Sequence, residues 1–296
     1  GGAYLPLDAS YPAERIAFMM QDAAIALLLT EERLAQHLDL NLDEQTFATF
    51  WLDSGWEEVA AFPTANLAPK SKPDNLAYLI YTSGSTGQPK AVAIEQRSAV
   101  AFLHWAGKVF PPDRLSGVLA STSICFDLSV FELFLPLSCG GRIILVENAL
   151  ALPGLGARAE VSLLNTVPSA AAELLRSDGI PASVRTINLA GEALTRTLVQ
   201  QLYERAGVEA VYNLYGPSED TTYSTYALMQ PGATITPSIG RPIWNTQAYV
   251  LDAEQQVVWE AAAGRRSSSV TRPSAALNRR SGQIGSSVPV RAAAGC

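Results

Sequence analysis

The chain has 296 residues, of which 48% are hydrophobic and 17% charged, a profile typical of a folded enzyme rather than of a disordered chain. Its formal net charge of −7 argues against a nucleic-acid-binding protein, and the sequence holds no apolar run of about eighteen residues that would span a membrane. The three cysteines, Cys125, Cys139 and Cys296, are too widely spread for a zinc site or a disulfide framework, so we expect a protein of the reducing cytoplasm.

The first third of the chain predicts helices and strands in alternation. Pro12 suits a first helical turn, and the apolar residues after it recur at helical spacing. A short apolar run at 24–30 predicts a buried strand, and a second at 75–84 predicts another that ends in a loop rich in glycine and serine. A strand at 91–96 and a helix at 97–110 follow.

The remainder of the chain continues this alternation. Further strands are predicted near 117–122, 142–146, 161–165, 185–189 and 209–214, with helices around 129–137, 168–176 and 194–206. Such alternation predicts an α/β fold with mostly parallel sheets flanked by helices. Residues 71–74 and 229–238 have the composition of surface connections.

The loop "YTSGSTGQPKAV" (81–92) is a candidate phosphate-binding segment. Its glycines and lysine do not have the spacing of a Walker A loop, and it fits neither the dinucleotide fingerprint nor a serine-hydrolase elbow. Backbone N–H groups, hydroxyls and Lys90 could nevertheless hold a polyphosphate. The alternative from the residues alone is a solvated hairpin loop.

Several sequence blocks in their order resemble the adenylation domains of nonribosomal peptide synthetases, members of the adenylate-forming superfamily. They are "GGAYLPLD", "YPAERI", the loop above, "FDLSVFELF", "NLAGEAL", "NLYGPSEDTTY" and "IGRPIWNTQAYVLD". Ala91 and Gln96 depart from the usual glycine and histidine. The resemblance implies the large N-terminal domain of an acetyl-CoA synthetase-like fold over residues 1–252, incomplete and truncated at its start.

The family uses ATP and Mg²⁺ to convert an amino acid to an aminoacyl-adenylate and then loads it onto the phosphopantetheine of a carrier domain. The resemblance implies phosphate binding by Thr82, Ser83, Gly84, Ser85, Thr86, Gly87 and Lys90. It implies Mg²⁺ binding by Glu219 and adenine binding by Gly191, Asn213 and Tyr215. Taken singly, Tyr215 would suit a half-buried core position, Glu219 a helix N-terminus and Asn213 a strand end.

Asp127 distinguishes amino acids from other carboxylic acids in this reading. In amino-acid-activating relatives an aspartate at this position pairs with the substrate α-ammonium group, whereas in an acyl-CoA ligase it would be a costly unpaired buried charge. The alternative structural role for Asp127 is a helix cap. The alternative functions are an aryl- or acyl-CoA ligase-type adenylating enzyme and an inert fragment.

The same motifs imply a substrate pocket of nine residues. They are Asp127, Leu128, Phe131, Asn165, Asn188, Ala190, Leu214, Thr222 and Tyr223. Beyond Asp127 none of them is formally charged, so a charged substrate side chain would find no counter-ion. The set resembles that of alanine-activating domains, and we expect alanine or another small residue as substrate, with side activity on its neighbours.

Residues 253–296 do not continue the family pattern. From residue 261 onward the chain has six arginines and no acidic residue, and the G-E-L block, the ribose-binding aspartate and the small C-terminal domain with its catalytic lysine are not found. We expect a non-homologous basic tail that is disordered or translated out of frame from about residue 262. The chain alone is then expected to be weakly active or inactive. Its expected partners are the peptidyl carrier and condensation domains of a parent synthetase.

Overall fold

The computed structural model describes residues 2–37, 46–83, 88–251, 274–279 and 288–290. The chain divides into two compact units, residues 1–96 and 97–296. The two units are described one at a time.

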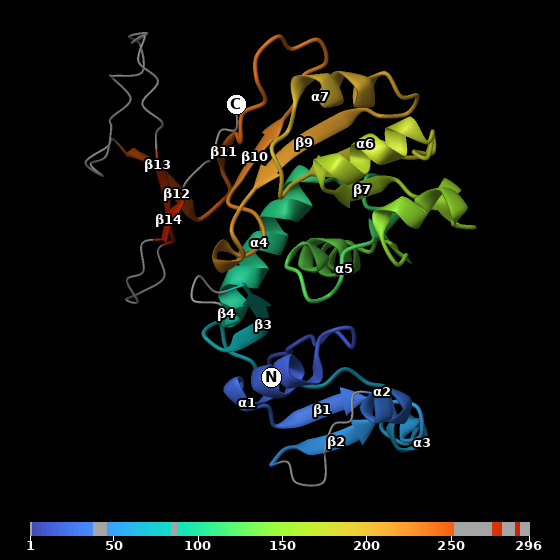
Figure 1. Cartoon of the computed structure of the whole chain (residues 1–296), viewed down its shortest axis with the longest axis vertical. Coiled ribbons are helices and arrows are strands. Elements are labelled where there is room, and N and C mark those ends of the chain that lie inside the picture. The colour runs from blue at the N-terminus through green and yellow to red at the C-terminus, as the bar shows by residue number, and fades with distance from the viewer. Residues whose placement is uncertain (1, 38–45, 84–87, 252–273, 280–287, 291–296) are drawn as a thin grey trace. The chain divides into compact units, whose positions relative to one another are not determined.

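Unit 1 contains a helix-flanked pair of parallel strands and a separate antiparallel hairpin (Figure 1). Its elements are α1 (Ala13–Asp22), β1 (Leu27–Thr30), α2 (Glu32–His37), β2 (Ala48–Trp51), α3 (Trp56–Ala60), β3 (Leu76–Thr82) and β4 (Lys90–Glu95). Ile16 and Met20, four residues apart on α1, pack with Leu28 of β1 in a small core. The β3–β4 hairpin carries the candidate phosphate loop between its strands.

Unit 2 is built around a seven-stranded sheet with the strand order β11-β10-β9-β8-β7-β5-β6. Its helices are α4 (Gln96–Val109), α5 (Leu128–Ser138), α6 (Pro168–Arg176) and α7 (Arg196–Tyr203), with short 3₁₀ turns η1 (Ala149–Gly154), η2 (Arg158–Glu160) and η3 (Ser218–Asp220). The strands are β5 (Val118–Ala120), β6 (Ile143–Leu145), β7 (Leu163–Thr166), β8 (Thr186–Leu189), β9 (Ala210–Tyr215), β10 (Thr225–Leu228) and β11 (Arg241–Pro242). Neighbouring strands pair in parallel from β9 through β8, β7 and β5 to β6. β10 pairs antiparallel with β9, and β11 pairs antiparallel with β10 at that edge of the sheet.

One face of this sheet is apolar and packs on α6 and α7 (Figure 1). Leu164, Ile187 and Val211 lie in register on adjacent strands and are all fully buried. Because side chains alternate along a strand, the next residues point to the opposite face. Those residues are Asn165, Asn188 and Tyr212, which are also in register.

The opposite face is lined by aromatic rings from α4 and α5. The Phe110 ring lies 5.1 Å from the Tyr212 ring and 5.2 Å from the Phe131 ring of α5. Trp105 of α4 lies 5.1 Å from Tyr226 of β10. Edge-to-face contacts of this kind stabilise packing beyond simple area burial. This aromatic layer positions α5, and with it the residues of the "FDLSVFELF" motif.

The last strands form a small antiparallel sheet of β12 (Thr246–Leu251), β13 (Ser274–Arg279) and β14 (Val288–Val290). β13 and β14 fall within the segment for which the sequence suggests disorder, and these two short stretches are strands in the structure. Among the described residues, no helix has the length and apolar character needed to cross a bilayer.

The α/β class with a mostly parallel sheet and flanking helices is confirmed. Each predicted strand and helix is present within a few residues of its expected position, and 71–74 and 229–238 are connections. Among the elements before residue 252, the sequence pattern does not predict α2, α3, β2, β10, β11 and β12. β10 and β11 are short and separated by a segment rich in glycine and proline, which obscures any alternation.

Candidate functional site

The candidate phosphate loop joins β3 to β4 in an antiparallel hairpin. Thr82 and Lys90 are paired directly across the hairpin at the mouth of the loop, so their side chains project from the same face. Lys90 is exposed and Thr82 half-buried. The predicted residues Gly84, Ser85, Thr86 and Gly87 lie outside the described residues, and Ser83 before them is exposed.

Tyr81 anchors the base of this loop to α1. Its hydroxyl donates to the Asp22 carboxylate at 2.7 Å, and its side chain is buried. Burial, reinforced by the hydrogen bond to Asp22 and by its charge, raises the pKa of the Tyr81 hydroxyl well above its usual range. The residue just before the loop is therefore tied to α1 by a hydrogen bond.

Asp127 stands at the N-terminus of α5 but does not cap it. Its side chain makes no capping hydrogen bond to the helix, and its residue is only 7% exposed. None of the ion pairs found among the described residues involves Asp127, so this buried carboxylate has no cationic side chain beside it there. The helix-cap alternative is therefore not what the geometry shows.

The surroundings of Asp127 disfavour its charge. Burial raises the pKa of the Asp127 carboxyl, hydrogen bonding from the Ser218 hydroxyl and nearby backbone N–H groups opposes this, and the negative charge of Glu219 adds to the rise. A cation placed beside Asp127 would relieve the cost of its ionised form. The electrostatic surroundings of the Asp127 carboxylate are therefore those that favour binding of a cation.

The structure brings several other predicted pocket residues close to Asp127. The Thr222 hydroxyl donates to the backbone carbonyl of Asp127 at 3.0 Å. The Tyr223 ring packs 5.9 Å from the Phe131 ring of α5, and its hydroxyl donates to Asn165 Oδ1 at 2.7 Å. All five residues are buried, four of them almost completely. We call Asp127, Phe131, Asn165, Thr222 and Tyr223 the pocket cluster.

The remaining predicted pocket residues extend this cluster. Asn188 is paired in register with Asn165, Ala190 and Leu214 are buried near the ends of β8 and β9, and Leu128 is half-buried at the start of α5. The side-chain amide of Asn188 is fully buried, and neither its nitrogen nor its oxygen has a hydrogen-bond partner among the described residues. Such a group costs about 1–3 kcal/mol, which a bound water or polar ligand would relieve.

The turn between β9 and β10 is strained. Thr221 and Thr222 both have positive φ, 62° and 69°, a conformation that β-branched residues rarely adopt. Gly216 precedes them, and a Cβ there would lie 2.7 Å from backbone atoms of Thr222 and Ser224. Each strained residue costs on the order of 1–3 kcal/mol, and such strain clusters at functional sites. This turn carries Glu219 and Thr222, two of the predicted site residues.

The predicted adenine-binding residues surround the ends of β8 and β9. Gly191 has a φ of 82°, and a Cβ there would meet only the Val167 side chain, at 3.5 Å. Asn213 Nδ2 donates to the Ser238 carbonyl at 2.9 Å, which leaves Asn213 Oδ1 as an acceptor for an amino group. Tyr215 is half-buried, and this burial raises the pKa of its hydroxyl.

Glu192, next to Gly191, fixes the adenine-side loop. Its carboxylate accepts from the backbone N–H of Ser169 at 2.9 Å and from the Ser169 hydroxyl at 2.8 Å, in the first turn of α6. The loop after β8 is thus tied to a helix N-terminus, where a negative charge is favoured.

Glu219, the predicted Mg²⁺ ligand, is exposed in η3. Among the described residues, no group of three or more His, Cys, Asp and Glu side chains could hold a metal ion. Mg²⁺ bound by Glu219 stays a prediction from the sequence motif.

Glu132 is a member of this site that the sequence motifs do not single out. It lies on α5, is fully buried, and accepts four hydrogen bonds. Its Oε2 accepts from the backbone N–H groups of Ser121 and Thr122, both at 2.9 Å, and its Oε1 from the Thr122 hydroxyl at 2.7 Å and Asn165 Nδ2 at 2.9 Å. An acid inside an otherwise apolar helical run is the signal that could have revealed it.

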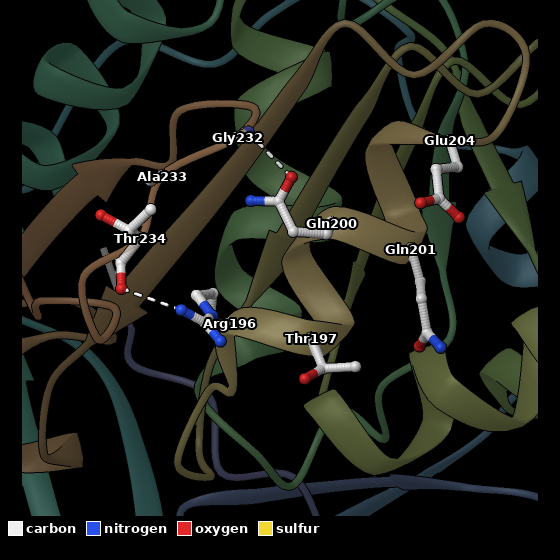
Figure 2. A pocket seen from close by; sticks show the side chains of 8 residues that line it. All are labelled: Arg196, Thr197, Gln200, Gln201, Glu204, Gly232, Ala233 and Thr234. Atoms are coloured by element: carbon white, nitrogen blue, oxygen red, sulfur yellow. Dashed lines mark hydrogen bonds between the residues drawn. The ribbon is translucent and has the colours of Figure 1, made fainter.

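A separate pocket of about 530 Å³ lies between α7 and the segment 232–234 (Figure 2). Two hydrogen bonds join its sides, from the Gly232 N–H to Gln200 Oε1 at 2.8 Å and from Arg196 Nη1 to the Thr234 carbonyl at 3.0 Å. No residue predicted for ATP or substrate lines this pocket, which is therefore not the predicted site.

Comparison with known proteins identifies the family of the chain. The model of the AMP-binding enzyme family matches residues 1–265. A linear gramicidin synthase protein of Brevibacillus parabrevis is 56% identical over 258 residues, which cover 87% of this chain and 5% of that protein. The AMB antimetabolite synthetase AmbB of Pseudomonas aeruginosa is 48% identical over 260 residues, covering 85% and 20%. The chain thus spans a small part of the curated relatives that it matches.

Solved structures of nonribosomal peptide synthetases share the fold. The crystal structure of FmoA3 matches with a TM-score of 0.80 and 26% identity, covering 95% of this chain and 29% of that chain. The four-domain synthetase holo-AB3403, bound to AMP and glycine, matches with a TM-score of 0.69 and 27% identity, covering 94% and 20%. The chain therefore belongs to the AMP-binding enzyme family, in the adenylation-domain branch found in nonribosomal peptide synthetases.

Proposed function

We propose that this chain is the part of a nonribosomal peptide synthetase that selects alanine, or another small amino acid, and activates it with ATP as an aminoacyl-adenylate. The observation that carries this proposal is the buried Asp127 carboxylate, which neither caps its helix nor pairs with a cationic side chain among the described residues. The α-ammonium group of an amino acid is the partner that this environment favours.

The pocket cluster supports a small substrate. Phe131 and Tyr223 are large and fully buried, and their contact leaves little room for a long side chain. The polar groups of Asn165 and Tyr223 are bonded to each other, and the neighbouring Glu132 carboxylate accepts four hydrogen bonds. A charged substrate side chain would find no free counter-ion among these described residues, which favours alanine, with glycine and serine as weaker substrates.

The residues proposed to bind ATP and Mg²⁺ come from both units of the chain. In unit 2, Gly191 would leave space for the purine, Tyr215 would stack on it, and Asn213 Oδ1 would accept from its amino group. In unit 1, Thr82 and Lys90 are paired across the hairpin, and the sequence motif implies phosphate binding by these two residues and by residues 83–87. Glu219 would bind Mg²⁺, which would neutralise charge on the phosphates.

In this proposal the substrate carboxylate attacks the α-phosphorus of ATP, a new oxygen–phosphorus bond forms, and pyrophosphate leaves. The carboxylate is a weak nucleophile, so the work of the protein is to orient it and to stabilise charge on the leaving phosphates. Asp127 orients the amino acid through its ammonium group, and the role proposed for Lys90 from its motif is to supply positive charge for the departing pyrophosphate. The thiol of a phosphopantetheine on a peptidyl carrier domain would then accept the aminoacyl group as a thioester, with cleavage of the acyl–phosphate bond and release of AMP. Condensation domains are further proposed partners.

The test is amino-acid-dependent exchange of labelled pyrophosphate into ATP, measured on the full-length gene product that carries this chain. All twenty amino acids are compared at equal concentration. We expect the highest rate with alanine, lower rates with glycine and serine, and background rates with charged or aromatic amino acids. Highest exchange with a charged or aromatic amino acid would contradict the assigned substrate, and exchange with none would contradict the function.

A further inference from the structure

The four hydrogen bonds of Glu132 have a consequence for the pocket. A carboxylate only accepts hydrogen bonds, so the side of the Asn165 amide that faces Glu132 must be the NH₂ group. Asn165 Oδ1 is thereby turned toward Tyr223, whose hydroxyl donates to it at 2.7 Å. The chain Glu132–Asn165–Tyr223 is fully buried and runs in a single direction of donation.

We propose that Glu132 is a positioning residue for substrate selection, which sets the Asn165 amide so that the Tyr223 hydroxyl donates into the protein and not toward the substrate. The inference deepens the proposed function and rests on it. With its proton engaged by Asn165, the Tyr223 hydroxyl donates no hydrogen bond to a substrate hydroxyl group, which disfavours serine relative to alanine.

The direction of every bond in the chain follows from Glu132, which accepts all four of its hydrogen bonds. Its Oε2 accepts from two backbone N–H groups, which can only donate. Only the hydrogen bonds at Oε1 can therefore change direction. Replacing Glu132 with glutamine would keep an oxygen on the backbone side and place an NH₂ group where Oε1 meets Asn165. The Asn165 amide would then turn over to present its oxygen, and its NH₂ group would face the Tyr223 hydroxyl.

In that arrangement the Tyr223 hydroxyl accepts from Asn165, and its own proton is released to bond elsewhere. A serine hydroxyl in the pocket could accept that proton, whereas an alanine methyl could not. A change in preference therefore reports on the hydrogen bond between Asn165 and Tyr223. A hydrogen bond contributes about 0.5–1.5 kcal/mol, so the preference should move by roughly fivefold.

The experiment measures the ratio of kcat/KM for serine to that for alanine, by pyrophosphate exchange on the full-length gene product. Glu132→Gln and Tyr223→Phe are each expected to raise this ratio by roughly fivefold, the second because the lost hydroxyl leaves Asn165 Oδ1 open to the serine hydroxyl. Since both act through one amide, the double variant should raise the ratio no further than either single variant.

Two control variants separate positioning from general destabilisation. Ile187→Val removes a methylene from the opposite face of the same sheet and is expected to lower stability by about 0.5–1.5 kcal/mol with no change in the ratio. Glu173→Gln makes the same chemical change at an exposed acid of α6, which pairs with Arg176, and should also leave the ratio unchanged.

Thermal unfolding of each variant is recorded first. If Glu132→Gln is folded and its ratio equals that of the unsubstituted protein, the inference is overturned. If Glu132→Gln does not fold, Tyr223→Phe decides, and an unchanged ratio there overturns it. Multiplicative effects in the double variant would show that the two residues act independently, which also contradicts the proposal. Absence of exchange with any amino acid in the unsubstituted protein would instead refute the proposed function, and the inference with it.

Discussion

The two faces of the unit 2 sheet are made by the same three strands but differ in chemistry. On one face Leu164, Ile187 and Val211 are fully buried against α6 and α7 and contain no polar side-chain atom. On the other face Asn165, Asn188 and Tyr212 occupy the next positions of those strands. Burying amides costs free energy unless they are hydrogen-bonded, so the first face serves stability and the second carries the site.

Replacing Asp127, the acid of the pocket cluster at the start of α5, is expected to have the largest effect. Asp127→Ala should lower kcat/KM for alanine by about a hundredfold or more, because the α-ammonium group would enter a buried site without its counter-charge. Pyrophosphate exchange measures this, with Glu173→Gln as the matched control. Activity that survives Asp127→Ala would favour an aryl- or acyl-CoA ligase-type reaction, for which an ammonium partner is irrelevant.

A change on the apolar face should show the opposite pattern. Leu164→Ala is expected to cost about 2–5 kcal/mol of unfolding free energy, measured by urea denaturation, because it leaves a cavity against α6 and α7. The neighbouring substitution Asn165→Ala should alter the serine-to-alanine ratio. If Leu164→Ala changed this ratio as much as Asn165→Ala does, the assignment of separate roles to the two faces would be wrong.

A substitution in the strained turn between β9 and β10 is expected to have a smaller effect. Gly216→Ala should lower the free energy of unfolding by about 1–3 kcal/mol, because the added Cβ would press on the backbone of Thr222 and Ser224. It should also raise the KM for alanine, since Thr222 holds the Asp127 backbone. Gly232→Ala on the loop after β10 tests the positive φ of 74° without such a contact and should leave the KM unchanged. Equal KM values in both variants would contradict the role of the turn.

The smallest expected effect is a pH-dependent gain in stability. Because burial raises the pKa of Asp127, its ionised form destabilises the unliganded fold above the ordinary carboxyl pKa of 3.8. Asp127→Asn should therefore raise the free energy of unfolding at neutral pH. The gain should shrink as the pH falls through the raised pKa and vanish below 3.8. Urea denaturation across this range measures it, and a loss of stability at neutral pH would show that the hydrogen bonds from Ser218 and the backbone outweigh the cost of burying the charge.

The apolar face could be predicted from the sequence more completely than the polar one. Runs such as residues 161–165 and 185–189 indicate buried parallel strands by composition alone, and the structure has β7 and β8 there. The pairing of Asn165 with Asn188 depends on strand register, which a single sequence does not define.

The hydrogen bonds of Glu132 could not be predicted from the sequence, for a similar reason. Glu132 accepts from Ser121 and Thr122, about ten residues earlier, and from Asn165, thirty-three residues later. Each partner is an ordinary loop or strand residue when taken alone, and only folding brings the donors together. Asp127 was predicted because its motif resembles a family, whereas its lack of a capping bond emerges only from the geometry.

The most direct test of the central claim compares alanine with propionate, which has the same carboxylate and nearly the same size but no ammonium group. Pyrophosphate exchange on the full-length gene product should be at least a hundredfold more efficient with alanine, because only alanine supplies a cation to the buried Asp127. Comparable exchange with propionate would contradict the account, since the Asp127 carboxylate would then have no role in recognising an amino acid.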